Sequence, residues 1–170
     1  MKRALLPITV LTLLSGCASM SPDECKTADW YQVGYQDGVN GNNPSIINDY
    51  SKDCAEAGVS ADHARWKEGF DKGTILYCSP DNGYQVGIAG KEYYGVCQSE
   101  QFVKNYQLGH QQYQVQQRIN EIDTQINVID NQLNNKPDKD TAQRLRKDRK
   151  ALTEERSDLL TPNINFNLHF

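Results

Sequence analysis

The chain has 170 residues, with 18 Lys and Arg against 22 Asp and Glu, and a formal net charge of −4. This length accommodates one ordinary domain, or a small domain with an appendage, and excludes a large enzyme of several domains. Nucleic acid is a disfavoured partner, because neutralising phosphates requires clustered Lys and Arg and this chain is acidic.

The first predicted element is a lipoprotein signal at residues 1–16. Lys2 and Arg3 precede an apolar run over residues 4–14, which is too short to span a bilayer as a helix. The run ends in Leu-Ser-Gly-Cys, which resembles the lipobox of bacterial lipoproteins. That resemblance implies cleavage before Cys17, diacylglycerol on its thiol and an N-acyl chain such as palmitate on its amine. An ordinary secretory signal with an incidental cysteine is the alternative.

The lipid anchor predicts the location of the protein. Several acyl chains hold a protein durably on a membrane where one would not. Ala18 and Ser19 follow Cys17, and by resemblance an Asp at the first of these positions would favour retention at the inner membrane. We therefore expect the outer membrane, facing the periplasm, with display on the cell surface left open.

Four cysteines remain beyond the anchor: Cys25, Cys54, Cys78 and Cys97. An even number in an exported chain predicts two disulfides. Three pairings are open, with Cys25–Cys54 and Cys78–Cys97 slightly favoured. A zinc site of four thiolates is the alternative, but no pair has the close Cys-x-x-Cys spacing typical of such sites.

An aromatic-glycine phrase recurs in residues 25–110. Trp30 to Gly38 corresponds to Trp66 to Gly73, and Tyr84-Gln-Val-Gly and Tyr106-Gln-Leu-Gly are shorter copies. Glycines four apart lie on one helical face and permit close packing. We expect helices near 26–38, 61–75 and 82–93, the second starting at Ser60 as N-cap, with loops at 40–51 and 79–83.

The aromatic side chains of the phrase have two interpretations. Trp30, Tyr35, Trp66 and Phe70 either form a core for which the glycines make room, or offer rings to a ligand. Carbohydrate or peptidoglycan would be the ligand that suits a periplasmic protein.

Residues 101–160 predict an antiparallel helical hairpin. Isoleucines at 119, 122, 126 and 129, with Leu133, repeat at the three-four spacing of a coiled-coil seam. Pro137 ends the first helix, and leucines at 145, 152 and 159 form the seam of the second. Two heptads per arm are marginal alone, so we expect the hairpin either to dock on the first half of the chain or to associate with a partner helix, with Ile122 and Ile126 as contacts. The mixed charges from Arg144 to Arg156 are interpreted as a solvated face.

The last segment, residues 161–170, alternates polar and apolar residues and ends in Phe166-Asn-Leu-His-Phe170. This pattern is typical of an extended strand. It predicts either addition to the edge of a partner's sheet or packing against the chain's own helices.

No catalytic or metal-binding motif emerges, and no cofactor is predicted beyond the acyl chains. Ser60, Asp62 and His63 supply the residue types of a catalytic triad, but adjacency in sequence does not create the required convergence. We expect a protein that is not an enzyme.

A larger pattern resembles a known family. It comprises Cys54-Ala-Glu-Ala-Gly58, the phrase at 66–73, Tyr77-Cys78, Gly83-Tyr-x-x-Gly87 and Val96-Cys97. Together they are similar to an uncharacterised family of Gram-negative lipoproteins, the domain of unknown function 2799, over residues 25–115. The resemblance implies an exported lipoprotein and assigns no activity.

We therefore predict a mainly α protein with five segments. They are a signal peptide (1–16), a lipidated linker (17–24), a disulfide-stapled domain of short helices (25–100), a helical hairpin (101–160) and an extended tail (161–170). The predicted function is an outer-membrane scaffold or accessory subunit that contacts an envelope protein through its helical arm. A module that binds peptidoglycan or another glycan is the alternative.

Overall fold

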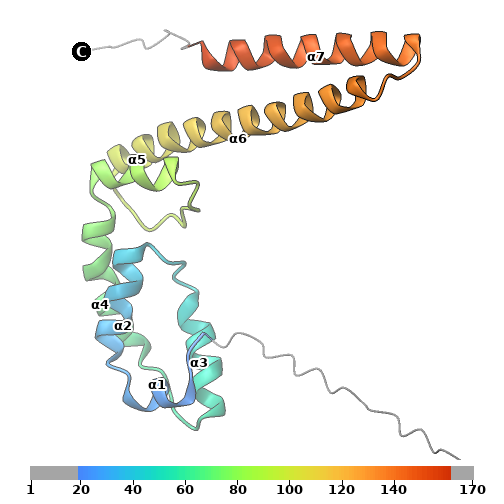
Figure 1. Cartoon of the computed structure of the whole chain (residues 1–170). Coiled ribbons are helices and arrows are strands. Elements are labelled where there is room, and N and C mark those ends of the chain that lie inside the picture. Colours follow the sequence, from blue (N-terminus) through green and yellow to red (C-terminus); the bar gives the residue numbers. More distant parts are fainter. Residues whose placement is uncertain (1–18, 162–170) are drawn as a thin grey trace, which may run out of the picture. The chain divides into compact units, whose positions relative to one another are not determined.

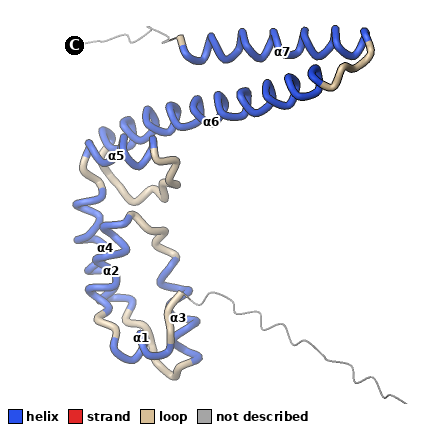
Figure 2. Tube along the Cα trace, in the orientation of Figure 1, coloured by secondary structure: helices blue, strands red, loops and turns tan. Residues whose placement is uncertain are grey.

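A computed structural model describes residues 19–161, and every regular element in this range is an α-helix (Figures 1 and 2). The helices are α1 (Pro22–Thr27), α2 (Trp30–Asn40), α3 (Ile46–Glu56), α4 (His63–Tyr77), α5 (Pro80–Ile88), α6 (Glu100–Asn134) and α7 (Lys139–Leu160). They form two compact units that divide inside α4, between Gly73 and Thr74. The predicted mainly α fold is confirmed.

Side-chain caps set the helix starts in the first unit. Ser21 and Glu24 form a reciprocal capping box at α1, and Asp29 accepts hydrogen bonds from two backbone N–H groups at the start of α2. At α4 the carboxylate of Asp62 accepts from the N–H of Arg65. These acceptors satisfy N–H groups that have no partner inside the helix. The helix predicted over 26–38 is therefore two helices, and Asp62 rather than Ser60 caps α4.

Helix α3 begins inside the segment 40–51 that the sequence predicted to be a loop and occupies its second half. Its buried residues Ile47, Tyr50 and Cys54 are spaced by three and four, so they lie on one face of a helix. The loop is confined to residues 41–45, where Gly41 adopts a left-handed conformation with φ 68°. The Asn, Pro and Ser of this segment mark the turn and do not extend it.

Close glycine contacts hold α2 and α4 side by side, as Figure 1 shows. A Cβ at Gly34 would collide with the carbonyl oxygen of Trp66, and one at Gly69 would collide with that of Tyr31. Gly73 meets Tyr35 in the same way, so residue numbers rise together along both helices and the helices are parallel. Backbones this close allow Cα–H···O contacts that larger residues would prevent.

The second unit repeats this contact with α5 and α6. A Cβ at Gly87 would collide with the carbonyl oxygen of Tyr106, and one at Gly109 with that of Tyr84. Each unit thus contains two parallel helices in which an aromatic residue three positions before a glycine offers its carbonyl to the partner's glycine. The recurring phrase in the sequence is the signature of this packing.

Both disulfides have the slightly favoured pairing, Cys25–Cys54 and Cys78–Cys97, each with Cα atoms 5.4 Å apart. Cys25 and Cys54 lie in α1 and α3, the segments that lead into α2 and α4. Cys78 and Cys97 lie directly before α5 and in the segment before α6. In each unit the disulfide therefore joins the two segments that precede the parallel helices.

The core of the second unit lies between the end of α4, α5 and the first turns of α6. Tyr77, Val86 and Phe102 are buried there, with the rings of Tyr93 and Tyr106 packed against them. The first turns of α6 therefore belong to the core of the second unit. α6 then extends into the hairpin with α7.

None of the helices within residues 19–161 combines the length and the apolar character that crossing a membrane requires.

Candidate interaction surface

The hairpin begins with a tight connection between α6 and α7. The N–H of Asn135 closes α6 onto the carbonyls of Asn131 and Gln132, and Lys136 adopts a positive φ of 54°. Pro137 follows, and the carboxylate of Asp138 caps α7 by accepting from the N–H groups of Asp140 and Thr141. The chain therefore reverses over the few residues that the sequence marked as a helix stop.

The seam between the two helices is uneven. Ile119 and Ile122 on α6, and Ala142 and Leu145 on α7, are buried, and Ile122 has no exposed surface. Ile126, Ile129 and Leu152 along the middle of the hairpin are only half-buried. The middle of the seam is thus less covered than its ends.

Ion pairs close one flank of the seam. Arg156 makes two hydrogen bonds to Asp123, at 2.7 and 3.4 Å, and Arg149 makes two to Asp130, at 2.6 and 3.2 Å. The acids are one heptad apart on α6 and the arginines one heptad apart on α7, so the two pairs stand in register. The hydrogen bonds from Arg149 hold the pKa of Asp130 below its usual range.

The opposite flank carries neutral side chains in its middle. On the first flank, α6 carries Asp123 and Asp130, each directly after a seam isoleucine. On the opposite flank, the corresponding α6 positions, directly before Ile126 and Leu133, are Gln125 and Gln132. Among the described residues, a single ion pair joins α6 to α7 on this flank. It is formed by Arg118 and Glu155, 2.7 Å apart, at the base of the hairpin. One flank is therefore closed by two ion pairs along its length, and the other by a single ion pair at its base.

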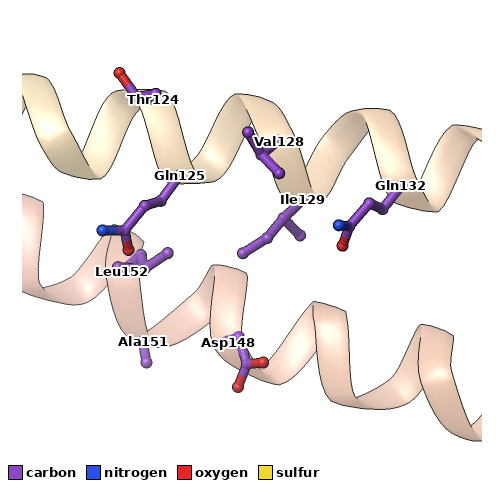
Figure 3. A pocket seen from close by; sticks show the side chains of 8 residues that line it. All are labelled: Thr124, Gln125, Val128, Ile129, Gln132, Asp148, Ala151 and Leu152. Atoms are coloured by element: carbon purple, nitrogen blue, oxygen red, sulfur yellow. The ribbon is translucent and has the colours of Figure 1, made fainter.

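An open groove lies on the neutral flank (Figure 3). It has a volume of about 600 Å³, and its walls come from α6 and α7: Thr124, Gln125, Val128, Ile129, Gln132, Asp148, Ala151 and Leu152. Val128 is 50% exposed beside it. A half-exposed apolar strip with polar amides along its edge is suited to receiving another helix.

Comparison with known proteins identifies the family. The sequence profile of a protein family of unknown function, DUF2799, matches residues 29–111. The uncharacterised protein YfiL of Escherichia coli strain K12 is 33% identical over 101 residues, which cover 57% of this chain and 77% of YfiL. This chain belongs to the DUF2799 family. No solved structure matches it.

The DUF2799 match and the groove occupy different parts of the chain. The match covers both glycine-packed helix pairs and ends at residue 111, whereas the groove residues run from Thr124 to Leu152. The groove therefore belongs to a part of this chain that the family profile does not describe.

The aromatic residues proposed as ligand contacts are mostly core residues in this DUF2799 protein. Trp30, Trp66 and Phe70 are buried, with Trp66 and Phe70 stacked at 4.8 Å between ring centroids, and Tyr35 alone is half-buried. The first unit therefore leaves little of these ring faces for a sugar to stack upon. The structure brings Trp66 and Phe70 together in one stack, whereas the ring of Trp30 packs near Tyr50 of α3.

A buried carboxylate that the sequence did not single out organises this core. Asp37 is 5% exposed and accepts hydrogen bonds from the Trp66 indole N–H at 2.8 Å, the Asn42 amide at 2.8 Å and the Tyr50 hydroxyl at 3.2 Å. Burial, followed by the negative charge of Asp37, raises the pKa of Tyr50. The sequence offered Asp37 only as one more acid beside the glycine phrase.

The structure gives no support to triad chemistry at Ser60, Asp62 and His63. The His63 ring instead lies 2.7 Å from the hydroxyl of Ser51, which also donates to the carbonyl of Ile47. The carboxylate of Asp62 caps α4. In the described part of the chain, no group of three His, Cys, Asp or Glu side chains is placed to hold a metal ion.

The remaining predicted sites divide between the hairpin and the chain ends. Ile122 is buried within the seam and Ile126 lies half-buried in it, so both contribute first to the hairpin itself. Cys17, Phe166 and Phe170 lie outside the described residues.

Proposed function

We propose that this DUF2799 protein is a noncatalytic, lipid-anchored scaffold or accessory subunit of the bacterial envelope that docks through its α6–α7 hairpin. The observation that carries the proposal is the open groove on the neutral flank, where Val128 remains half-exposed. A hairpin that served only to fold on itself would gain from covering these apolar side chains.

The length and continuity of α6 support the proposal that the hairpin is a docking arm. α6 has 35 residues, which corresponds to about 52 Å of helix, and its first turns belong to the core of the second unit. The same helix then carries one wall of the groove. Because no loop interrupts α6, the groove is held rigidly with respect to that core.

The anchor rests on the sequence. The basic start, the short apolar run and Cys17 in Leu-Ser-Gly-Cys support lipidation and an outer-membrane location facing the periplasm. The two disulfides agree with an oxidising compartment. In this proposal the acyl chains provide the membrane contact and the hairpin provides the protein contact.

Affinity capture from cross-linked cells tests the docking arm. The unchanged chain is compared with Val128→Glu, which places a charge at the groove, and with Asn127→Glu, an equal charge change at the neighbouring exposed position. We expect an identified envelope protein to be captured by the unchanged chain and by Asn127→Glu, and at least about tenfold less by Val128→Glu. Equal capture by all three chains would remove the groove from the proposal.

The same cells test the anchor. A fatty-acid label should be incorporated into the unchanged chain and not into Cys17→Ser, and the Cys17→Ser chain should leave the membrane fraction. Retention of the label by Cys17→Ser would overturn lipidation at this residue.

A further inference from the structure

α7 carries a second regular face beside the groove. Its members are exposed and follow one another at intervals of three, four, three and four residues: Arg144, Lys147, Ala151, Glu154 and Asp158. Residues at this spacing lie along one stripe of a helix. Ala151 at the centre of the stripe also lines the groove. The stripe therefore borders the flank that the ion pairs of Arg149 and Arg156 leave open.

The charges of this stripe invert around its centre. Two basic residues precede Ala151 and two acidic residues follow it. If a second α7 lies antiparallel across Ala151, Arg144 faces Asp158 of the other copy and Lys147 faces Glu154 of the other copy. A two-fold axis repeats both pairs, so four opposite-charge contacts form. A parallel arrangement would place like charges together, which disfavours it.

These charges are available for such contacts. Within residues 19–161, Arg144, Lys147 and Asp158 make no ion pair. Glu154 lies 3.6 Å from Lys150 on the same helix, with both side chains exposed. An exposed pair of this kind is weak and exchanges readily for another.

The central alanine and the groove fit the same arrangement. A methyl side chain at the crossing point allows two helices to approach closely, since the interaxial distance depends on the side chains at the contact. A second α7 seated on this stripe packs against Ala151, which also lines the groove. The charges and the small central residue therefore favour the same placement.

We propose that the hairpin pairs with a second copy of this chain, α7 antiparallel to α7 about Ala151, to form a four-helix assembly. This deepens the proposed function, on which it rests, by naming the partner of the α7 stripe. In this proposal, two hairpins paired through α7 present the surface that contacts the envelope protein.

Complementary charge variants of the purified full chain, held in a mild detergent, test the pairing. One variant carries Arg144→Glu with Lys147→Glu, and the other carries Glu154→Lys with Asp158→Lys. Each alone presents one sign of charge to its own copy, so the dissociation constant of the dimer should rise at least about tenfold. Mixed one to one, the two variants should associate with each other, because an all-acidic stripe then faces an all-basic one.

A matched control separates the stripe from net charge. Lys139→Glu with Arg146→Glu makes the same change in charge at exposed positions on a different face of α7, and should leave the dimer unchanged. Circular dichroism checks that all variants keep their helices. Sedimentation equilibrium up to about 100 μM measures the association.

Cysteine cross-linking gives an independent readout. Ala151→Cys should form a covalent dimer under mild oxidation, since the two-fold axis brings residue 151 next to its copy, whereas Thr153→Cys on another face should form at least about tenfold less. A chain that stays monomeric throughout this range, or a dimer that both charge variants leave intact, would overturn the pairing. Because these measurements use the purified chain alone, their failure leaves the capture of an envelope protein standing, and the converse also holds.

Discussion

Gly69 is buried in α4, where it packs directly against the backbone of α2. Any Cβ there would run into the carbonyl oxygen of Tyr31 on α2, which is backbone and cannot rotate away. Alanine favours a helix by about 1 kcal/mol over glycine, but forcing atoms into a closed contact costs about 1–3 kcal/mol or more. The contact outweighs the helix preference because the backbones themselves would have to separate.

After the helix preference is subtracted, Gly69→Ala should therefore lower the free energy of unfolding by up to about 2 kcal/mol, as measured by urea denaturation. Lys72→Ala, on the exposed face of the same helix, serves as the control and should change stability by less than about 0.5 kcal/mol. A stabilised Gly69→Ala protein would show that α2 and α4 are not packed backbone to backbone.

Because two tyrosines are buried, we predict that the folded protein loses stability at high pH. Burial and the negative charge of Asp37 raise the pKa of Tyr50, and burial raises the pKa of Tyr77 to about 12. The unfolded chain releases these protons near pH 10, so the native state then binds more protons than the unfolded state and stability falls as pH rises. The slope should reach about 1.4 kcal/mol per pH unit for each tyrosine between pH 10 and 12.

Urea denaturation from pH 8 to 11.5 measures this slope. Tyr50→Phe and Tyr77→Phe should each flatten it, because phenylalanine has no proton to release. An equally steep curve in the double variant would assign the alkaline loss to other groups.

Among the elements, the hairpin was the easiest to predict and its flanks were the hardest. Isoleucines at intervals of three and four, with a proline stop, determine two helices and their shared seam. That pattern does not show which arginines of α7 form ion pairs with α6. Arg149 and Arg156 were interpreted as part of a solvated face, but in the structure they bind Asp130 and Asp123. The groove was beyond prediction for the same reason, since it exists only where two helices diverge in space.

Helix α3 and Asp37 show a second limit of sequence patterns. α3 has only three buried residues in eleven, and its Asn, Asp, Ser and Lys obscure the periodicity that would reveal it. Asp37 is polar yet buried, because Trp66 and Tyr50, from two other helices, satisfy its oxygens. In both cases, contacts with residues distant in the sequence determine the structure, and the sequence pattern does not identify those residues.

Truncating Ile122 should open the hairpin, whereas truncating Val128 should not. Ile122 has no exposed surface, so Ile122→Ala should cost about 2–5 kcal/mol, while the half-exposed Val128 should cost less than about 1 kcal/mol when changed to Ala. Amide hydrogen exchange along α7 should accelerate only in Ile122→Ala. Comparable acceleration in both variants would place Val128 inside the seam.

At the scale of the whole molecule, the two units share one arrangement of cysteine, helix, cysteine, helix. The repeated phrase of Trp66 to Gly69 and Tyr84 to Gly87 indicated this repeat in the sequence. Each unit is built around one pair of closely packed helices, and the division between the units falls after Gly73.

The disulfide pattern has a consequence for the way the chain matures. Both bridges connect a cysteine with the next one along the chain, at separations of 29 and 19 residues. Among these four cysteines, each pair is complete before the next pair has emerged from the amino end, so oxidation in order of emergence favours the native bonds over the other pairings of the four.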